Sequence, residues 1–112
     1  MIVQVIDELT RRTMREQLVW TSKYHYDELW SGPTFFADCG DEVLHLTIGA
    51  RNQIKLSYQE TTLVDTHSTD TPEAIAVREL HSACLAQIDK QNERDKAVAA
   101  EHLASILGIG VD

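Results

Sequence analysis

The chain has 112 residues, of which 43% are hydrophobic and 25% charged, a composition typical of one folded domain rather than of a disordered segment. The formal net charge of −8 repels phosphate backbones and argues against a nucleic-acid-binding protein. No apolar stretch approaches the ~20 residues that span a bilayer, which argues against a membrane protein.

The first residues lack the positive charge of a secretory signal, and Gln4 and Asp7 interrupt their apolar pattern. The two cysteines, Cys39 and Cys84, lie far apart in the sequence. We therefore expect a cytoplasmic protein with both thiols reduced.

Residues 2–17 are predicted to form an amphipathic helix, because Ile2, Val5, Ile6 and Leu9 follow the helical i, i+3, i+4, i+7 spacing. Near Leu18 the apolar period changes from 3.6 to 2 residues, which predicts a half-buried strand. Both sets of alternating residues in 18–26 contain side chains that suit a core, so the pattern leaves the buried face open.

The middle of the chain alternates between short apolar runs and turn residues. A second strand is expected to begin at residues 35–36 and to end in a turn at 38–41. Residues 43–48 and 53–58 alternate on either side of a loop at 49–52, which predicts a hairpin, and residues 61–65 suit a short edge strand.

Thr71, Pro72 and Glu73 form a strong helix start: an N-cap threonine, a proline at the first helical position and an acid near the positive dipole end. Residues 89–96 are polar throughout, so the helix either continues into solvent or turns there. Residues 97–107 regain an apolar side, and Gly108 suits a left-handed C-cap.

These elements predict a single α+β domain over residues 1–112. We expect an N-terminal helix, an antiparallel sheet of three to five strands, and one long or two C-terminal helices packed on one face of the sheet. Residues 97–109 are a candidate oligomerisation or partner-binding helix. Their apolar side can fold back on its own sheet, pair with another copy, or bind a partner groove.

No motif with recognisable chemistry emerges. His81 and Cys84 share a helical face, and Cys39 with His45 can complete a metal set only if the fold brings all four together, so no metal is expected. The triad residue types at 67–70 are neighbours in one loop and do not reach relay geometry. No Gly-rich phosphate loop is present, and no cofactor is predicted.

The helix that ends in Leu18, Val19 and Trp20, the short antiparallel strands and the Thr-Pro-capped helix together resemble small proteins of phages and mobile elements. The resemblance covers about residues 1–90 as a pattern. It implies an accessory protein that works by binding.

The first functional hypothesis is a non-enzymatic protein-binding module, acting as a homodimer that occupies a protein partner. Its negative charge and the apolar side of residues 97–109 favour this interpretation. The expected contacts are Trp30, Asp38, Asp41, Glu42, Leu103, Ile106 and Leu107.

The alternative hypothesis is a nucleotide- or sugar-binding protein that uses the aromatic segment 20–36. Six of the seven aromatic residues lie in this segment. The predicted ligand-binding residues are Trp20, Tyr24, Tyr26 and His45. An enzyme remains a third hypothesis, because catalytic residues can assemble from distant positions.

Overall fold

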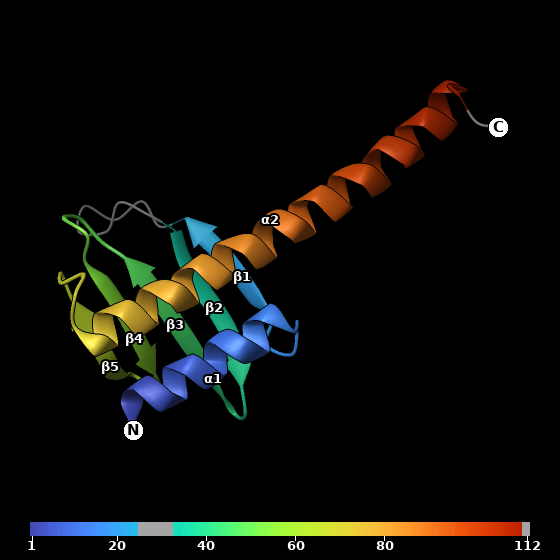
Figure 1. The fold of residues 1–112 in the computed structure, drawn as a ribbon. Coiled ribbons are helices and arrows are strands. Elements are labelled where there is room, and N and C mark those ends of the chain that lie inside the picture. The colour runs from blue at the N-terminus through green and yellow to red at the C-terminus, as the bar shows by residue number, and fades with distance from the viewer. Residues whose placement is uncertain (25–32, 111–112) are drawn as a thin grey trace.

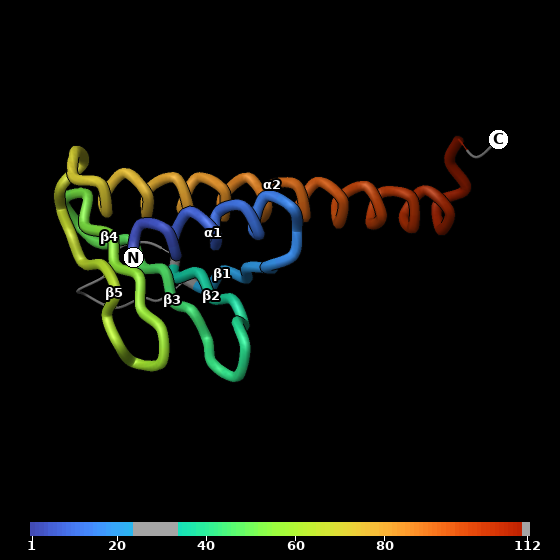
Figure 2. The backbone as a smooth tube through the Cα atoms, turned by 60° about the horizontal axis from the view of Figure 1, so that its bottom comes forward, coloured from blue at the N-terminus to red at the C-terminus, as the bar shows by residue number. Residues whose placement is uncertain are grey.

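The computed structural model describes residues 1–24 and 33–110 and has the predicted α+β fold. Helix α1 (Ile2–Met14) is followed by a five-stranded antiparallel sheet and by the 36-residue helix α2 (Pro72–Leu107). The two helices lie side by side on one face of the sheet (Figures 1 and 2). Of the two possibilities that the sequence left open at residues 89–96, a continuous helix or a turn, the structure has the continuous helix.

The strands form a meander in which each pairs antiparallel with the next in the chain. The outermost strands, β1 and β5, are the edges of the sheet. The strands are β1 (Trp20–Tyr24), β2 (Pro33–Cys39), β3 (Glu42–Ile48), β4 (Ile54–Tyr58) and β5 (Thr61–Thr66).

Two of the hairpins turn within two residues. Gly40 opens the β2–β3 turn with φ +67°, at the position where a type II′ turn has glycine. The β4–β5 turn consists of Gln59 and Glu60, with φ +55° and +68°. Positive φ at both residues is the type I′ pattern that suits the strand twist, although neither residue is the glycine or asparagine that this turn favours.

The core lies between the helices and one face of the sheet. Trp20 is paired with Ala37, which is paired with Leu44, and all three side chains are buried. This pairing decides which alternating set of β1 faces inward. The other large buried apolar residues of the helices and strands are Ile6, Leu9, Phe35, Leu46, Ile54, Leu56, Val64, Val77, Leu80 and Cys84, and Leu18 adds one from the segment between α1 and β1.

Helix α2 extends far beyond this core (Figure 1). The Cα radius of gyration is 17.1 Å, against about 13 Å for a compact domain of this length. The excess arises because residues 91–107 leave the sheet, and all of them except Ala104 are exposed. The C-terminal half of α2 therefore does not fold back on its own sheet.

Candidate functional site

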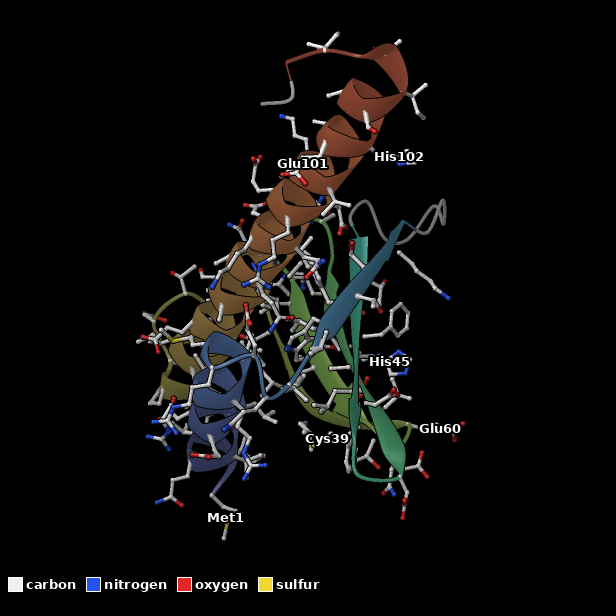
Figure 3. All side chains as sticks on the ribbon, turned by 90° about the vertical axis from the view of Figure 1, so that its right-hand side faces the viewer. Met1, Cys39, His45, Glu60, Glu101 and His102 are labelled. Atoms are coloured by element: carbon white, nitrogen blue, oxygen red, sulfur yellow. The ribbon has the colours of Figure 1, made fainter. Side chains whose placement is uncertain are left out.

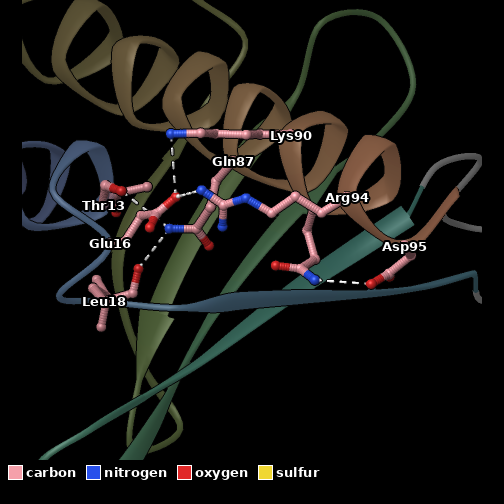
Figure 4. A network of polar contacts seen from close by, with 8 residues as sticks. Thr13, Glu16, Leu18, Gln87, Lys90, Arg94 and Asp95 are labelled. Atoms are coloured by element: carbon pink, nitrogen blue, oxygen red, sulfur yellow. Dashed lines mark hydrogen bonds and ion pairs between the residues drawn. The ribbon is translucent and has the colours of Figure 1, made fainter. Parts of the chain in front are cut away.

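The base of this extension is fastened to the body by Gln87 (Figure 4). Its amide oxygen accepts a hydrogen bond from the backbone N of Trp20 at 2.7 Å. Its amide nitrogen donates to the backbone oxygens of Thr13 at 3.0 Å and Leu18 at 2.8 Å. One side chain thus ties α2 to the end of α1 and to the start of β1.

A second contact joins Trp20 to α1. The indole Nε1 donates to the Thr13 hydroxyl at 2.9 Å, and that hydroxyl donates to the Leu9 carbonyl at 2.8 Å. Both Trp20 and Thr13 are buried. A buried indole N–H needs such a partner, because leaving it unpaired would cost about 1–3 kcal/mol.

An exposed ion cluster follows one turn further along α2. Glu16 lies 3.4 Å from Lys90 and 3.1 Å from Arg94. The charge of Arg94, followed by the hydrogen bond from Lys90, holds the pKa of Glu16 below its ordinary value. These contacts all use one side of α2, so they set the direction in which the helix leaves the body.

The C-terminal half of α2, defined as residues 91–107, carries large apolar side chains in solvent. Leu103, Ile106 and Leu107 are 55%, 66% and 65% exposed, and Val98 is 67% exposed. Figure 3 shows Glu101 and His102 on this part of the helix, far from His45 on the sheet. Among the described residues, the predicted contacts Leu103, Ile106 and Leu107 therefore gather on a surface that the body leaves uncovered.

The end of α2 is capped as predicted. Gly108 has φ +69°, and the N–H of Ile109 donates to the carbonyl of Ala104 at 2.9 Å. This is the Schellman arrangement, which satisfies the last carbonyls of a helix. The apolar surface thus sits on a properly terminated helix, and Ile109 adds a side chain that is 59% exposed.

A groove of about 800 Å³ lies between α1 and α2. Apolar atoms from Met14, Ile75, Ala83 and Ala86 line it, with Thr10 and Thr13 on the α1 side. Its volume falls in the range of small-molecule sites. The local sequence patterns could not reveal this groove, because it arises from the relative placement of two helices far apart in the chain.

The predicted acidic contacts lie at the opposite end of the molecule from the helix tip. Asp38, Asp41 and Glu42 are exposed around the β2–β3 turn. Glu60 borders the same surface hollow as Glu42. The hairpin ends therefore bring four carboxylates to one end of the sheet. Trp30, the other predicted contact, lies outside the described residues.

The predicted aromatic site is divided by the sheet. Trp20 is 3% exposed and faces the helices. His45 lies on the other face, because its neighbours Leu44 and Leu46 point inward, and its ring packs against Phe36 at 4.8 Å between centroids. Trp20 and His45 therefore do not line a common pocket. Tyr24 is the last residue of β1, and Tyr26 lies outside the described residues.

The histidines and cysteines considered for a metal do not converge. Cys84 is buried on α2, and burial raises the pKa of its thiol to about 12. His81 packs against Phe35, and burial followed by the charge of Arg78 lowers its pKa. Within residues 1–24 and 33–110, no group of three or more His, Cys, Asp or Glu side chains is placed to hold a metal ion.

None of the helices within the described residues is both long and apolar enough to cross a membrane. Comparison of the chain with protein-family models, with curated proteins and with solved structures yields no match.

Proposed function

We propose that this chain is a non-enzymatic protein-binding module that acts as a homodimer and occupies a protein partner. One observation carries the proposal: the C-terminal half of α2 holds Val98, Leu103, Ile106 and Leu107 in solvent. Burying such a side chain fully is worth about 1.5–3 kcal/mol, so the side of the helix that gathers Leu103, Ile106 and Leu107 favours association.

The acidic end of the sheet suits a second, separate contact. Asp38, Asp41 and Glu42 are exposed there, and the chain carries a net charge of −8. A negative surface of this kind attracts a basic partner and speeds its approach. We assign self-association to the helix and partner capture to the acidic hairpin. The origin in a phage or mobile element stays a prediction.

The test uses three immobilised proteins: the wild type, a charge-reversed Asp38→Lys, Asp41→Lys, Glu42→Lys variant, and an Ile106→Asp variant. The proposal expects the wild type to retain a basic partner from cell extract in stoichiometric amount and the charge-reversed variant to lose it. Ile106→Asp should lose self-association and keep a residual affinity for that partner. Equal retention by the wild type and the charge-reversed variant would remove the acidic hairpin from the proposal.

A second candidate function is binding of a small apolar molecule in the groove between α1 and α2, favoured by its volume and its apolar lining. A fluorescent apolar probe such as anilinonaphthalene sulfonate tests it. Binding that is lost in Ala86→Phe, which fills the groove, would support this function. Unchanged probe fluorescence with the wild type would exclude it.

A further inference from the structure

We propose that the tip of α2, residues 103–109, docks into the groove between α1 and α2 of a second copy, and that two such contacts close a two-fold dimer. The inference rests on the proposed self-association and names the surface that receives the tip. The two α2 helices then lie antiparallel, with the two-fold axis beside residues 94 and 95. Each copy contributes one groove and one tip.

The groove and the tip are apolar surfaces of complementary shape that one chain leaves open. The α2 side of the groove carries small side chains, among them Ser82, Ala83 and Ala86. Small side chains let a second helix approach closely, because the distance between packed helices depends on the side chains at the contact. The tip carries the large and exposed side chains of Leu103 and Leu107. Large residues of one helix that face small residues of another fill the space between them without a cavity.

The spacing along α2 gives the register of this contact. Leu103 follows Ser82 by 21 residues, and Leu107 follows Ala86 by the same interval, which is three heptads. A straight helix drifts by about 20° per heptad against this repeat, so about 60° separates the two surfaces. A left-handed crossing of the two helices takes up this drift. Leu103 of each copy then lies opposite Ala86 of the other, and Leu107 lies opposite Ser82.

The charges between the groove and the tip favour the antiparallel direction. The same stripe of the helix carries Asp89, Glu93 and Lys96, all exposed. The antiparallel pair places Glu93 of each copy opposite Lys96 of the other, whereas a parallel pair would place each charge against its own equivalent and leave both grooves empty. Exposed ion pairs contribute little energy, so they select the direction, and the two docked tips supply the affinity.

The end of the groove near the start of α2 carries a positive charge that suits the tip. Arg78 lines this end, and its guanidinium donates to the backbone oxygens of Ser68 and Asn52 at 2.7 Å. Arg78 has no carboxylate partner within residues 1–24 and 33–110. The docked tip brings the C-terminal end of a helix, capped by Gly108, beside this charge. The last carbonyl groups of a helix carry partial negative charge, which a cation stabilises.

The proposed contact is large enough for a stable dimer. Tips that met only each other would bury a few residues a side, whereas a stable interface takes about 20–30 residues a side. The groove is lined by 13 residues. Together with the tip and the stripe between them, each copy reaches the size of a stable interface. Beside the stripe, Ile106 of one copy comes to lie next to Leu85 of the other, and both side chains are exposed in the single chain.

Cysteine cross-linking tests the register. Ala86→Cys and Leu103→Cys are combined in one chain that also carries Cys39→Ala, and the remaining Cys84 is buried. Within one chain the two new thiols lie about 25 Å apart along the helix and cannot bond each other. In the proposed dimer each lies opposite the other thiol of the second copy. Oxidation with copper phenanthroline should therefore give a covalent dimer.

Each single variant should stay free of cross-links, because identical positions of the two copies also lie about 25 Å apart along the axis. The matched control combines Ala86→Cys with Val98→Cys, whose thiol lies on another side of α2, and it should not cross-link either. Cross-linking of either single variant, or a double variant that is dimeric but not cross-linked, would overturn the inference and leave the proposed self-association intact. A monomeric wild type would overturn both.

A second variant tests the groove without touching the tip. Ala86→Phe fills the groove from an exposed position, and both contacts of the dimer lose their space. We expect its dimer dissociation constant to rise at least about 30-fold in sedimentation experiments. The control Gln91→Phe adds the same side chain to an exposed position outside the stripe and should leave the constant unchanged. Equal dissociation constants of the two variants would overturn the inference.

Discussion

Replacement of Gln87 by leucine tests the contact that fastens α2 to the body. The leucine has a similar size but forms none of the three hydrogen bonds, to the N of Trp20 and to the carbonyls of Thr13 and Leu18. Each such bond contributes about 1 kcal/mol net, so we expect the free energy of unfolding to fall by about 3 kcal/mol. For a domain of this size the melting temperature should fall by roughly 10–15 °C.

Urea denaturation followed by tryptophan fluorescence measures this loss, because Trp20 is buried beside the altered site. The matched control is Gln91→Leu, one turn further along the helix. Among the residues that the structure describes, the Gln91 amide nitrogen donates a hydrogen bond to the exposed Asp95 carboxylate, at 2.9 Å, and the side chain has no bond to the body. We expect the control to change stability by less than about 0.5 kcal/mol. Equal stability of the two variants would refute the assignment of Gln87 as the main fastening.

Three further predictions concern the body. Glu60→Gly should stabilise the fold by about 0.5–1 kcal/mol, because glycine removes the strain of φ +68°. Asp41→Gly, at a turn position without positive φ, should not stabilise it. Urea midpoints compare the two variants, and a lower stability of Glu60→Gly than of the wild type would contradict the assigned turn conformation. A thiol reagent should modify only Cys39 of the two cysteines in the native chain, since Cys84 is buried with its pKa raised to about 12, and rapid modification of both thiols would contradict this. The same pKa shift predicts that the free energy of unfolding falls above about pH 9 by roughly 1.4 kcal/mol per pH unit, because the Cys84 thiol ionises only in the unfolded chain. Because the pKa of His81 is lowered in the fold, its contribution to stability is present above the ordinary value near 6.5 and is lost as the pH falls, when the unfolded chain takes up the proton first. The free energy of unfolding should therefore be lower at pH 5.5 than at pH 7.5 in the wild type, and this difference should be smaller in His81→Leu. An identical pH dependence of the two proteins would remove His81 as the cause.

Local patterns in the sequence predicted most of the elements. The Thr71 side chain accepts a hydrogen bond from the N of Ala74 at 3.2 Å, as an N-cap does, and Gly108 adopts the left-handed conformation expected of it. These signals are reliable because each depends on residues within one turn of the chain. The first helix, expected over residues 2–17, ends at Met14, where Glu16 adopts φ +60° and the chain turns toward β1.

Features that depend on distant residues were not predictable in this way. The Gln87 amide bonds to groups 67 to 74 residues earlier in the chain, and nothing in its immediate sequence indicates that role. The buried face of β1 was open because both alternating sets contain large side chains, and only the pairing of Trp20 with Ala37 decides it. The polar run 89–96 gave no packing signal, because all of its side chains are exposed and it contacts the body through the ion pairs of Lys90 and Arg94 with Glu16.

The candidate site shows the same division. An apolar side on residues 97–107 was visible from its spacing, and Leu103, Ile106 and Leu107 are exposed on the helix as expected of a contact surface. The separation of Trp20 and His45 onto opposite faces required the strand register. The groove between α1 and α2 required the packing of the two helices.

Sedimentation equilibrium over a range of protein concentrations is the most direct test of the central claim that the C-terminal half of α2 holds two copies together. The account predicts a mass of about twice the 12.6 kDa of one chain. This mass should be unchanged in Ala97→Asp, because residue 97 lies on the opposite side of α2 from residue 106, and it should fall to 12.6 kDa in Ile106→Asp. A wild-type mass of 12.6 kDa at every concentration would contradict the account, as would a dimer that Ile106→Asp leaves intact.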